Sequence, residues 1–226
     1  MAPPVLLVHG FASSFEHNWR QNGWVDLLAD AGRTVLPVDL LGHGSSASPH
    51  DPDAYADLEA GVAAALPPEG TVAAVGFSLG ARLLLGVVAD RPERFDRVVV
   101  GGVGANLFEP GEPEPVAQAL EAGDAGAPGL GGLFVRFAEG SGNDPLALAA
   151  CLRSRRPPLS AERLARITCP VLVVIGDRDF AGPADPLVAA LPDARSKILR
   201  NVDHFGTPKD FGFIDAALDF LGAVPT

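Results

Sequence analysis

A serine flanked by glycines is the first feature of this chain that could carry chemistry. Residues 76–80 read Gly-Phe-Ser-Leu-Gly, and Ser78 stands where an apolar strand pattern gives way to a helix pattern. A G-x-S-x-G sequence in this setting can form a nucleophile elbow, a strained turn that holds the serine out, with glycines because bulkier side chains would collide. The alternative is an ordinary strand-to-helix turn that a serine happens to occupy.

A nucleophilic serine needs a histidine base and a carboxylate that orients the base. Of the five histidines only His204 follows Ser78, and it stands between the last strand pattern and the C-terminal helix pattern. Asp177 and Asp179 follow the preceding strand pattern, whereas the loop after the strand before that one has no acid before Glu109. Because loops after parallel strands meet at one edge of a sheet, we expect Ser78, His204 and one of these aspartates to converge as a catalytic triad.

Strand and helix patterns alternate along the chain, as is typical of an α/β protein with a parallel sheet and right-handed crossovers. Apolar runs typical of strands covered on both faces occupy residues 5–8, 34–38, 71–75, 97–100, 171–175 and 196–199. Helical periodicity occupies residues 24–31, 53–65, 79–90 and 211–221. These patterns predict about six parallel strands flanked by helices.

One long interval, between the fourth and fifth strand patterns, breaks this alternation. Residues 106–132 are dense in Gly, Pro and Glu, and short helical candidates follow at residues 133–138, 145–152 and 160–166. A structureless loop of this length is improbable in a compact domain. We therefore expect residues 106–166 to form a small helical lid insertion, and residues 1–105 and 167–226 to form the core.

Composition narrows the possible partners and the compartment. The chain has 226 residues, 47% hydrophobic, and a formal net charge of −11, which argues against nucleic acid or an anionic membrane surface as partner and leaves a small-molecule substrate. The N-terminal sequence lacks the basic region of a signal peptide, and no apolar run is long enough to span a membrane. Cys151 and Cys169 do not have the spacing of metal ligands, and neither has a CxxC partner. We therefore expect two reduced, buried thiols in a cytoplasmic protein. The oligomeric state stays undetermined.

Five short motifs together resemble the α/β-hydrolase superfamily, and in particular its small bacterial esterase-like members with a helical lid. They are LLVHGF after the first strand, VDLLGHGSS after the second, GFSLGA at Ser78, GDRD after the fifth and NVDHF after the sixth. The order Ser, Asp, His along the chain is also that of the superfamily. The resemblance implies the α/β-hydrolase fold with the strands in the spatial order second, first, third, fourth, fifth, sixth, and implies that the first two strands of the family are missing.

The resemblance also assigns roles. The acid of the family stands three places after the strand-ending glycine, here Gly176, which favours Asp179, and leaves Asp177 to the turn. The oxyanion hole would consist of the backbone N–H groups of Phe11 and Leu79. The remaining family histidines, His9 and His43, would support loops. No metal or cofactor is implied.

The substrate is less directly indicated. Aromatic residues near the motifs are candidates for an apolar pocket, and the lack of basic residues near the motifs favours a neutral, apolar carboxylic ester. The same triad also supports C–C bond hydrolysis, thioester hydrolysis, a menaquinone-pathway-like lyase reaction and cofactor-free perhydrolysis. A non-catalytic ligand-binding member of the fold would predict a damaged triad, but here all three positions are filled. The pocket candidates are Phe108, Phe134, Phe137, Phe180 and Phe205.

Overall fold

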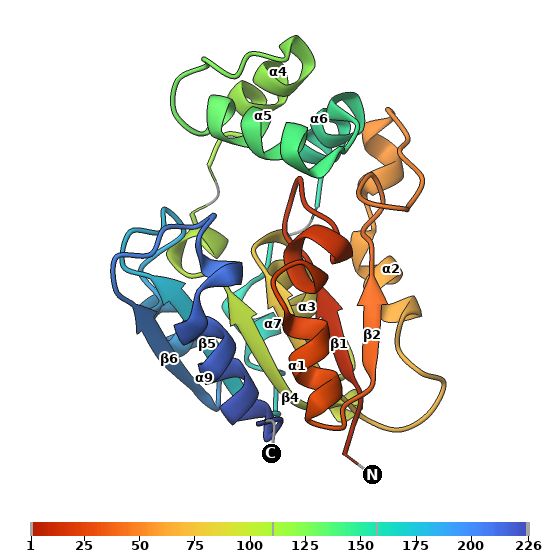
Figure 1. The fold of residues 1–226 in the computed structure, drawn as a ribbon, viewed down its shortest axis with the longest axis vertical. Coiled ribbons are helices and arrows are strands. Elements are labelled where there is room, and N and C mark those ends of the chain that lie inside the picture. The colour runs from red at the N-terminus through yellow and green to blue at the C-terminus, as the bar shows by residue number, and fades with distance from the viewer. Residues whose placement is uncertain (1, 110, 157, 225–226) are drawn as a thin grey trace.

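The computed structural model of the protein describes residues 2–109, 111–156 and 158–224. Within these residues the chain forms a six-stranded, entirely parallel sheet with the strand order β2-β1-β3-β4-β5-β6 (Figure 1). This is the spatial order that the resemblance implied, so the prediction is confirmed. The strands are β1 (Val5–Val8), β2 (Val35–Val38), β3 (Val72–Phe77), β4 (Phe95–Gly101), β5 (Val171–Gly176) and β6 (Ala194–Leu199).

Helices cover both faces of the sheet, which explains why the central strands are apolar along their whole length. In β1, Leu6 faces the layer that contains α2 (Leu58–Ala64), α3 (Leu79–Asp90), α7 (Ala161–Leu164) and α8 (Asp185–Ala190). The neighbouring Leu7 faces α1 (Trp24–Asp30) and α9 (Phe211–Leu221) on the other side. Both leucines are fully buried. The loops at the carboxyl ends of the strands therefore rest on a sheet that is packed from both sides.

The helix expected at residues 53–65 is divided in two. A 3₁₀ turn, Pro52–Tyr55, precedes α2, and α2 itself begins only after Asp57. The carboxylates of Asp51 and Asp57 accept hydrogen bonds from the N–H groups of Asp53 and Ala60, so each caps its own short element. Two capping residues within one apolar pattern explain the division.

Three helices follow β4 and the 3₁₀ turn Ala105–Leu107: α4 (Glu114–Ala122), α5 (Leu130–Ser141) and α6 (Pro145–Arg153). They lie beyond the carboxyl ends of the strands, and α4 packs against both α5 and α6 (Figure 1). The sequence patterns missed α4 because of the surrounding Gly and Pro. Pro115 stands in the first turn of α4 and Gly123, with φ +62°, ends it, so these residues delimit the helix instead of excluding it.

Two smaller predictions concern the thiols and the membrane. Cys151 and Cys169 are both free and buried, as predicted. Burial raises the pKa of the Cys169 thiol to about 11 and also raises the pKa of Cys151. Among the described residues, every helix is too short or too polar to cross a lipid bilayer.

Candidate active site

Ser78 occupies a strained turn between β3 and α3. Its φ of 51° and ψ of −115° lie in a region that a non-glycine residue rarely adopts. A Cβ atom at Gly76 would lie 2.8 Å from the Cα of Ala81, and one at Gly80 would lie 2.3 Å from the carbonyl oxygen of His9. Glycine is therefore required at both positions because the backbone passes too close for any side chain. The turn is also held by the Ser78 N–H, which donates to the carbonyl of Gly101 over 2.8 Å.

His204 joins Ser78 to a buried carboxylate. Its Nε2 lies 2.9 Å from the Ser78 Oγ, and its Nδ1 lies 2.8 Å and 3.0 Å from the two carboxylate oxygens of Asp179. The side chains of His204 and Asp179 are 4% and 0% exposed. An ionised carboxylate only accepts hydrogen bonds, so Asp179 holds the proton on Nδ1 and leaves Nε2 as the acceptor for the serine hydroxyl. This arrangement can deprotonate a serine as it attacks a carbonyl carbon.

Asp177 and Asp179 differ in what their carboxylates contact. Asp179 accepts the Ala181 N–H over 2.8 Å in addition to the His204 ring, which fixes the carboxylate in its own loop. The exposed Asp177 accepts the N–H of Asn201 over 2.7 Å. Asn201 has a φ of 60°, so Asp177 stabilises a strained residue in the loop that leads to His204.

Aromatic rings surround the His204 imidazole. The Phe180 ring centre lies 4.3 Å from that of His204, and the Phe77 and Phe205 centres lie at 5.0 Å and 5.7 Å. These rings restrict water around the Asp–His hydrogen bond, which strengthens it. Gly102, with φ +66°, completes the enclosure, because a Cβ atom there would lie 3.1 Å from the His204 Cε1 and 2.6 Å from Phe77.

The loop after β1 approaches Ser78 from the other side. A Cβ atom at Gly10 would lie 3.3 Å from the Ser78 Cβ, so the backbone of Gly10 and Phe11 passes directly beside the serine. The Gly10 N–H donates to the side-chain oxygen of buried Asn18 over 3.2 Å, which holds this loop in place. Leu79 is the first residue of α3, where N–H groups lack partners within the helix and the helix dipole is positive.

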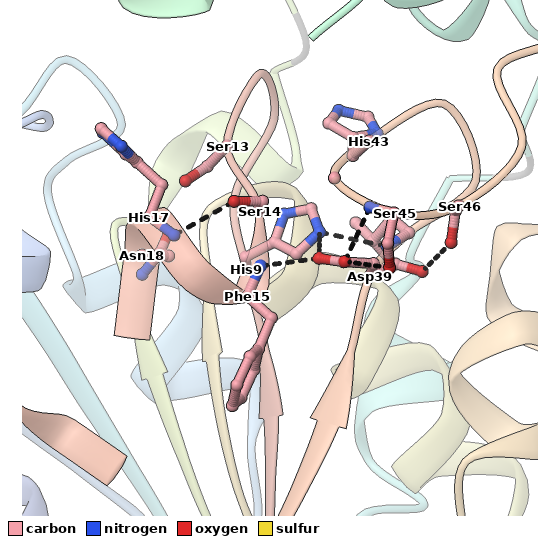
Figure 2. A network of polar contacts seen from close by, with 12 residues as sticks. His9, Ser13, Ser14, Phe15, His17, Asn18, Asp39, His43, Ser45 and Ser46 are labelled. Carbon is pink, nitrogen blue, oxygen red and sulfur yellow. Dashed lines mark hydrogen bonds and ion pairs between the residues drawn. The ribbon is translucent and has the colours of Figure 1, made fainter. Parts of the chain in front are cut away.

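Asp39 organises the same region from the end of β2 (Figure 2). Its carboxylate accepts the N–H groups of Phe15 and Ser45 over 2.7 Å and 2.9 Å and the Ser45 hydroxyl over 2.8 Å. Although burial opposes the charge, these three hydrogen bonds together hold the pKa of Asp39 below its usual value. The ionised carboxylate thus ties the loop after β1 to the loop after β2.

His9 and His43 bond to backbone groups in these loops. His9 donates from Nδ1 to the carbonyl of Gly10 over 2.8 Å and accepts the Leu40 N–H at Nε2 over 3.1 Å. Burial lowers its pKa to about 4, so the ring is neutral at pH 7 and its 3.7 Å approach to Asp39 is not an ion pair. His43 donates to the carbonyl of Leu41 over 3.0 Å, and burial lowers its pKa to about 3.

A cavity of about 780 Å³ opens at Ser78, between the core and the helices α4, α5 and α6. The core contributes Phe11 and Leu79, and α5 contributes Phe134. The volume is that of a small-molecule site. Of the five predicted pocket residues, Phe134 and Phe180 belong to the cavity lining.

The other three predicted pocket residues, Phe108, Phe137 and Phe205, lie outside that lining. Phe137 and Phe205 instead pack against each other, with ring centres 5.2 Å apart, and line a smaller hollow of about 200 Å³. Phe137 also stacks edge-on against His17, so its side of α5 faces away from Ser78.

The expectation from the sequence that basic residues are lacking near the site is wrong. Arg82 and Arg156 both line the cavity that contains Ser78. The position of Arg82 could have been predicted from the sequence. It stands four residues after Ser78 on a helix pattern, and residues at that spacing share a helix face. Arg156 follows α6 and carried no such signal.

Asn18 and Asp39 were also missed as supports of the loop after β1. Their side chains accept hydrogen bonds from backbone N–H groups of distant residues. Asp39 lies within the VDLLGHGSS motif, but the motif does not show which N–H groups it would bind, and Asn18 lies in none of the five motifs. Among the described residues there is no cluster of three or more His, Cys, Asp or Glu side chains that could hold a metal ion.

Residues 5–216 match the alpha/beta hydrolase family, and the chain belongs to that family. It is also 32% identical, over 225 residues, to the dihydrolipoyllysine-residue acetyltransferase component of the acetoin cleaving system of Cupriavidus necator, covering 90% of this chain. The chain spans 59% of the length of that relative.

Three solved structures share the fold. A thermophilic esterase from Thermogutta terrifontis has a TM-score of 0.73 and 21% identity, covering 100% of this chain and 92% of its own. A bromoperoxidase from Bacillus anthracis has a TM-score of 0.71 and 19% identity, covering 98% and 92%. The 2-hydroxy-6-oxo-6-phenylhexa-2,4-dienoate hydrolase from Rhodococcus sp. strain RHA1 has a TM-score of 0.68 and 19% identity, covering 98% and 90%. At these identities the likeness concerns the fold alone.

Proposed function

We propose that the protein is a serine hydrolase that cleaves carboxylic esters through an acyl-enzyme formed on Ser78. The observation that carries the proposal is the continuous contact from Asp179 through His204 to Ser78, at the edge of a cavity large enough for a small molecule. An esterase among the structural neighbours agrees with it.

In this mechanism His204 takes the hydroxyl proton of Ser78 as the serine oxygen attacks the ester carbonyl. Asp179 stabilises the imidazolium that forms, and His204 then gives the proton to the departing alcohol. A water molecule, activated by the same histidine, releases the acid and restores the serine. The backbone N–H groups of Phe11 and Leu79 would donate to the oxyanion, and loss of one such donor typically costs about 10²–10³ in rate.

We further propose that α4, α5 and α6 act as a lid over this site. The last part of the predicted 106–166 insertion does not belong to it, because α7 packs with α3 in the helix layer against the sheet. Val116, Leu130 and Phe134 supply the apolar part of the cavity wall, opposite the core residues Phe11 and Leu79. A segment placed in this way selects substrates by shape and apolar contact but contributes no group to the proton transfers. Its substitutions should therefore change KM and substrate preference more than the chemical step.

Other reactions use the same three side chains: C–C bond hydrolysis, thioester hydrolysis, a menaquinone-pathway-like lyase reaction and perhydrolysis. Ester hydrolysis ranks first because it needs only these groups and water, whereas perhydrolysis needs peroxide and the others need a specialised substrate. A non-catalytic binding role would not need the hydrogen bond between Ser78 and His204.

Hydrolysis of p-nitrophenyl esters of increasing acyl length tests the proposal. We expect a burst of p-nitrophenol equal to the enzyme concentration, and a transient mass increase of one acyl group on the peptide that contains Ser78. Ser78→Ala should abolish both. Turnover of these esters by a folded Ser78→Ala protein at more than a tenth of the wild-type rate would overturn the proposal. A thioester and a vinylogous diketone in the same panel would identify the alternative reactions.

A further inference from the structure

Two arginines stand in the wall of the Ser78 cavity, and the mechanism proposed above uses neither. Arg82 lies on α3, one turn after the serine, and its N–H donates to the Ser78 carbonyl over 3.0 Å. Arg156 follows α6 and reaches the same cavity from the side of residues 106–166. Both side chains are half-buried. The core and the proposed lid each therefore bring one cation to a single cavity.

The positive charges of the two guanidinium groups, which line one cavity, oppose each other. The pKa of Arg82 is lowered, first by burial and next by the positive charge of Arg156. Arg156 donates to the carbonyl of Cys151 over 3.0 Å and to the hydroxyl of Ser154 over 2.7 Å, and both of these acceptors are neutral. Like charges in one cavity oppose each other, and an anion between them would lessen that repulsion.

The charges around the pair indicate the side on which an anion would lie. Arg82 and Arg156 also line a second hollow of about 280 Å³, but its wall contains the carboxylates of Asp57 and Glu59. Arg163 occupies that side and already pairs with Glu59 and Asp90. An anion in the second hollow would meet these acids.

On the Ser78 side the cavity wall also contains two acids, and both are exposed to solvent. The cavity lining there includes Glu109 and Glu112, which are exposed residues of the loop before α4. Because both side chains are exposed, water screens their charge. The interior next to Ser78 is thus the side on which the positive charge of the pair is least opposed.

We propose that Arg82 and Arg156 form a carboxylate-binding subsite in the Ser78 cavity, and that the substrate is the monoester of a short dicarboxylic acid. This proposal rests on the function proposed above. A guanidinium group binds a carboxylate through two parallel hydrogen bonds, a geometry that a point charge cannot match. The free carboxylate of the acyl part would lie between the arginines while Ser78 attacks the ester carbonyl. Water supplies a hydroxyl group to the acyl carbon and a proton to the alcohol, and the bound carboxylate is unchanged.

A matched pair of substrates tests the subsite during turnover. Ethyl hydrogen glutarate and ethyl hexanoate have similar length and differ in the terminal charge. We expect the wild-type protein to prefer the glutarate monoester in kcat/KM. Arg82→Gln and Arg156→Gln should each lower the ratio of the two kcat/KM values by about 10-fold to 100-fold, the range for a hydrogen bond to a charged group.

Arg155→Gln is the matched control for these variants. Arg155 adjoins Arg156 in the chain but is exposed and lies outside the cavity lining, and its substitution removes the same charge. The ratio should be unchanged in this variant. A wild-type preference for ethyl hexanoate, or an equal fall of the ratio in Arg155→Gln, would overturn the subsite.

Binding of glutarate itself separates this proposal from the function it rests on. Calorimetry with Ser78→Ala protein needs no turnover, and we expect glutarate to bind it and to lose at least tenfold in affinity when Arg156→Gln is added. If neither ester is hydrolysed but glutarate binds in this way, the hydrolase function fails and the subsite stands. If ethyl hexanoate is hydrolysed through Ser78 and glutarate does not bind, the subsite fails and the hydrolase function stands.

Discussion

The loop after β1 and the loop after β6 each carry a buried histidine to the same edge of the sheet, and the two histidines have opposite surroundings. His9 is 0% exposed and both of its ring nitrogens bond to backbone groups. His204 is 3% exposed, and its ring nitrogens contact the carboxylate of Asp179 and the hydroxyl of Ser78. Residue type and burial are thus nearly the same at the two positions.

The difference lies in what each ring could do with a proton. Both ring nitrogens of His9 are taken by backbone groups, and although the Asp39 carboxylate lies 3.7 Å from Nε2, burial lowers the pKa of His9 to about 4, so it stays neutral and holds two loops together. His204 lies between a group that can release a proton and a carboxylate that can stabilise the imidazolium. A buried histidine therefore serves as scaffold or base according to whether its partners are backbone amides or ionisable side chains.

The largest expected effect on catalysis comes from replacing Ser78 or its base, His204. Ser78→Ala and His204→Ala should each lower kcat by about 10⁴ or more, and the double variant should lose no more than either alone, because the triad acts as a unit. Ester hydrolysis under saturating substrate measures this, with circular dichroism to verify folding. Losses that multiply in the double variant would show that Ser78 and His204 act independently.

The next effect distinguishes the two aspartates after β5. Asp179→Asn should lower kcat by up to about 10⁴, because an amide in place of the carboxylate favours the wrong His204 tautomer. Asp177→Asn is the control, and should change kcat little while lowering stability through its contact with the strained Asn201. Steady-state kinetics and urea unfolding of both variants would check this. The reverse pattern would assign the orienting role to Asp177.

The scaffold histidines should appear in the pH dependence of stability. The pKa values of His9 and His43 are lowered to about 4 and about 3, below the value of about 6.5 expected when unfolded. The unfolded state therefore binds more protons as the pH falls through 6.5, and stability falls with it. Two such groups give a slope of up to about 2.7 kcal/mol per pH unit between roughly pH 6 and 4.

Urea unfolding at pH 7, 6 and 5 measures this slope, and His43→Gln is the informative variant. The contribution of carboxylates remains in this variant, so only the histidine contribution should fall, by about half. An identical slope in wild-type and His43→Gln protein would show that His43 is not held neutral by the fold.

The smallest expected effect comes from loosening the loop after β1 without touching the reacting groups. Asn18→Ala removes the acceptor of the Gly10 N–H, and should lower kcat by about tenfold with KM nearly unchanged, less than the loss of a whole oxyanion donor. Asn22→Ala is a suitable control because its side chain donates to the carbonyls of His17 and Asn18 and not to the Gly10 loop. Equal losses in the two variants would indicate a general effect of the segment of residues 16–22 and not of the contact with Gly10.

The sheet and the convergence of the strand-end loops could be predicted because they depend on local patterns. Continuous apolar runs identified strands with two covered faces, and the order of strands then brings the loops of Ser78, Asp179 and His204 to one edge. The aromatic pocket was predicted less well. Whether a ring on α5 faces Ser78, as Phe134 does, or packs away from it, as Phe137 does, depends on how the helix is rotated.

The sequence patterns also failed to predict the charged groups in the cavity, and this error was larger than the one about the aromatic residues. Arg82 and Arg156 are far apart in the chain and line one cavity because α4, α5 and α6 lie beyond the strand ends (Figure 1). Nothing in the neighbouring sequence of Arg156 indicates that contact. Tertiary placement, which no local pattern encodes, therefore decides the polarity of the cavity.

Labelling with a fluorophosphonate probe, followed by peptide mapping, tests the contrast between the two histidines most directly. The probe reacts with a serine that a neighbouring base has activated. We predict labelling of Ser78 in wild-type protein, the same labelling in folded His9→Asn protein, and none in folded His204→Ala protein. Labelling that persists in His204→Ala and disappears in His9→Asn would contradict the account, because the base would then lie in the loop after β1.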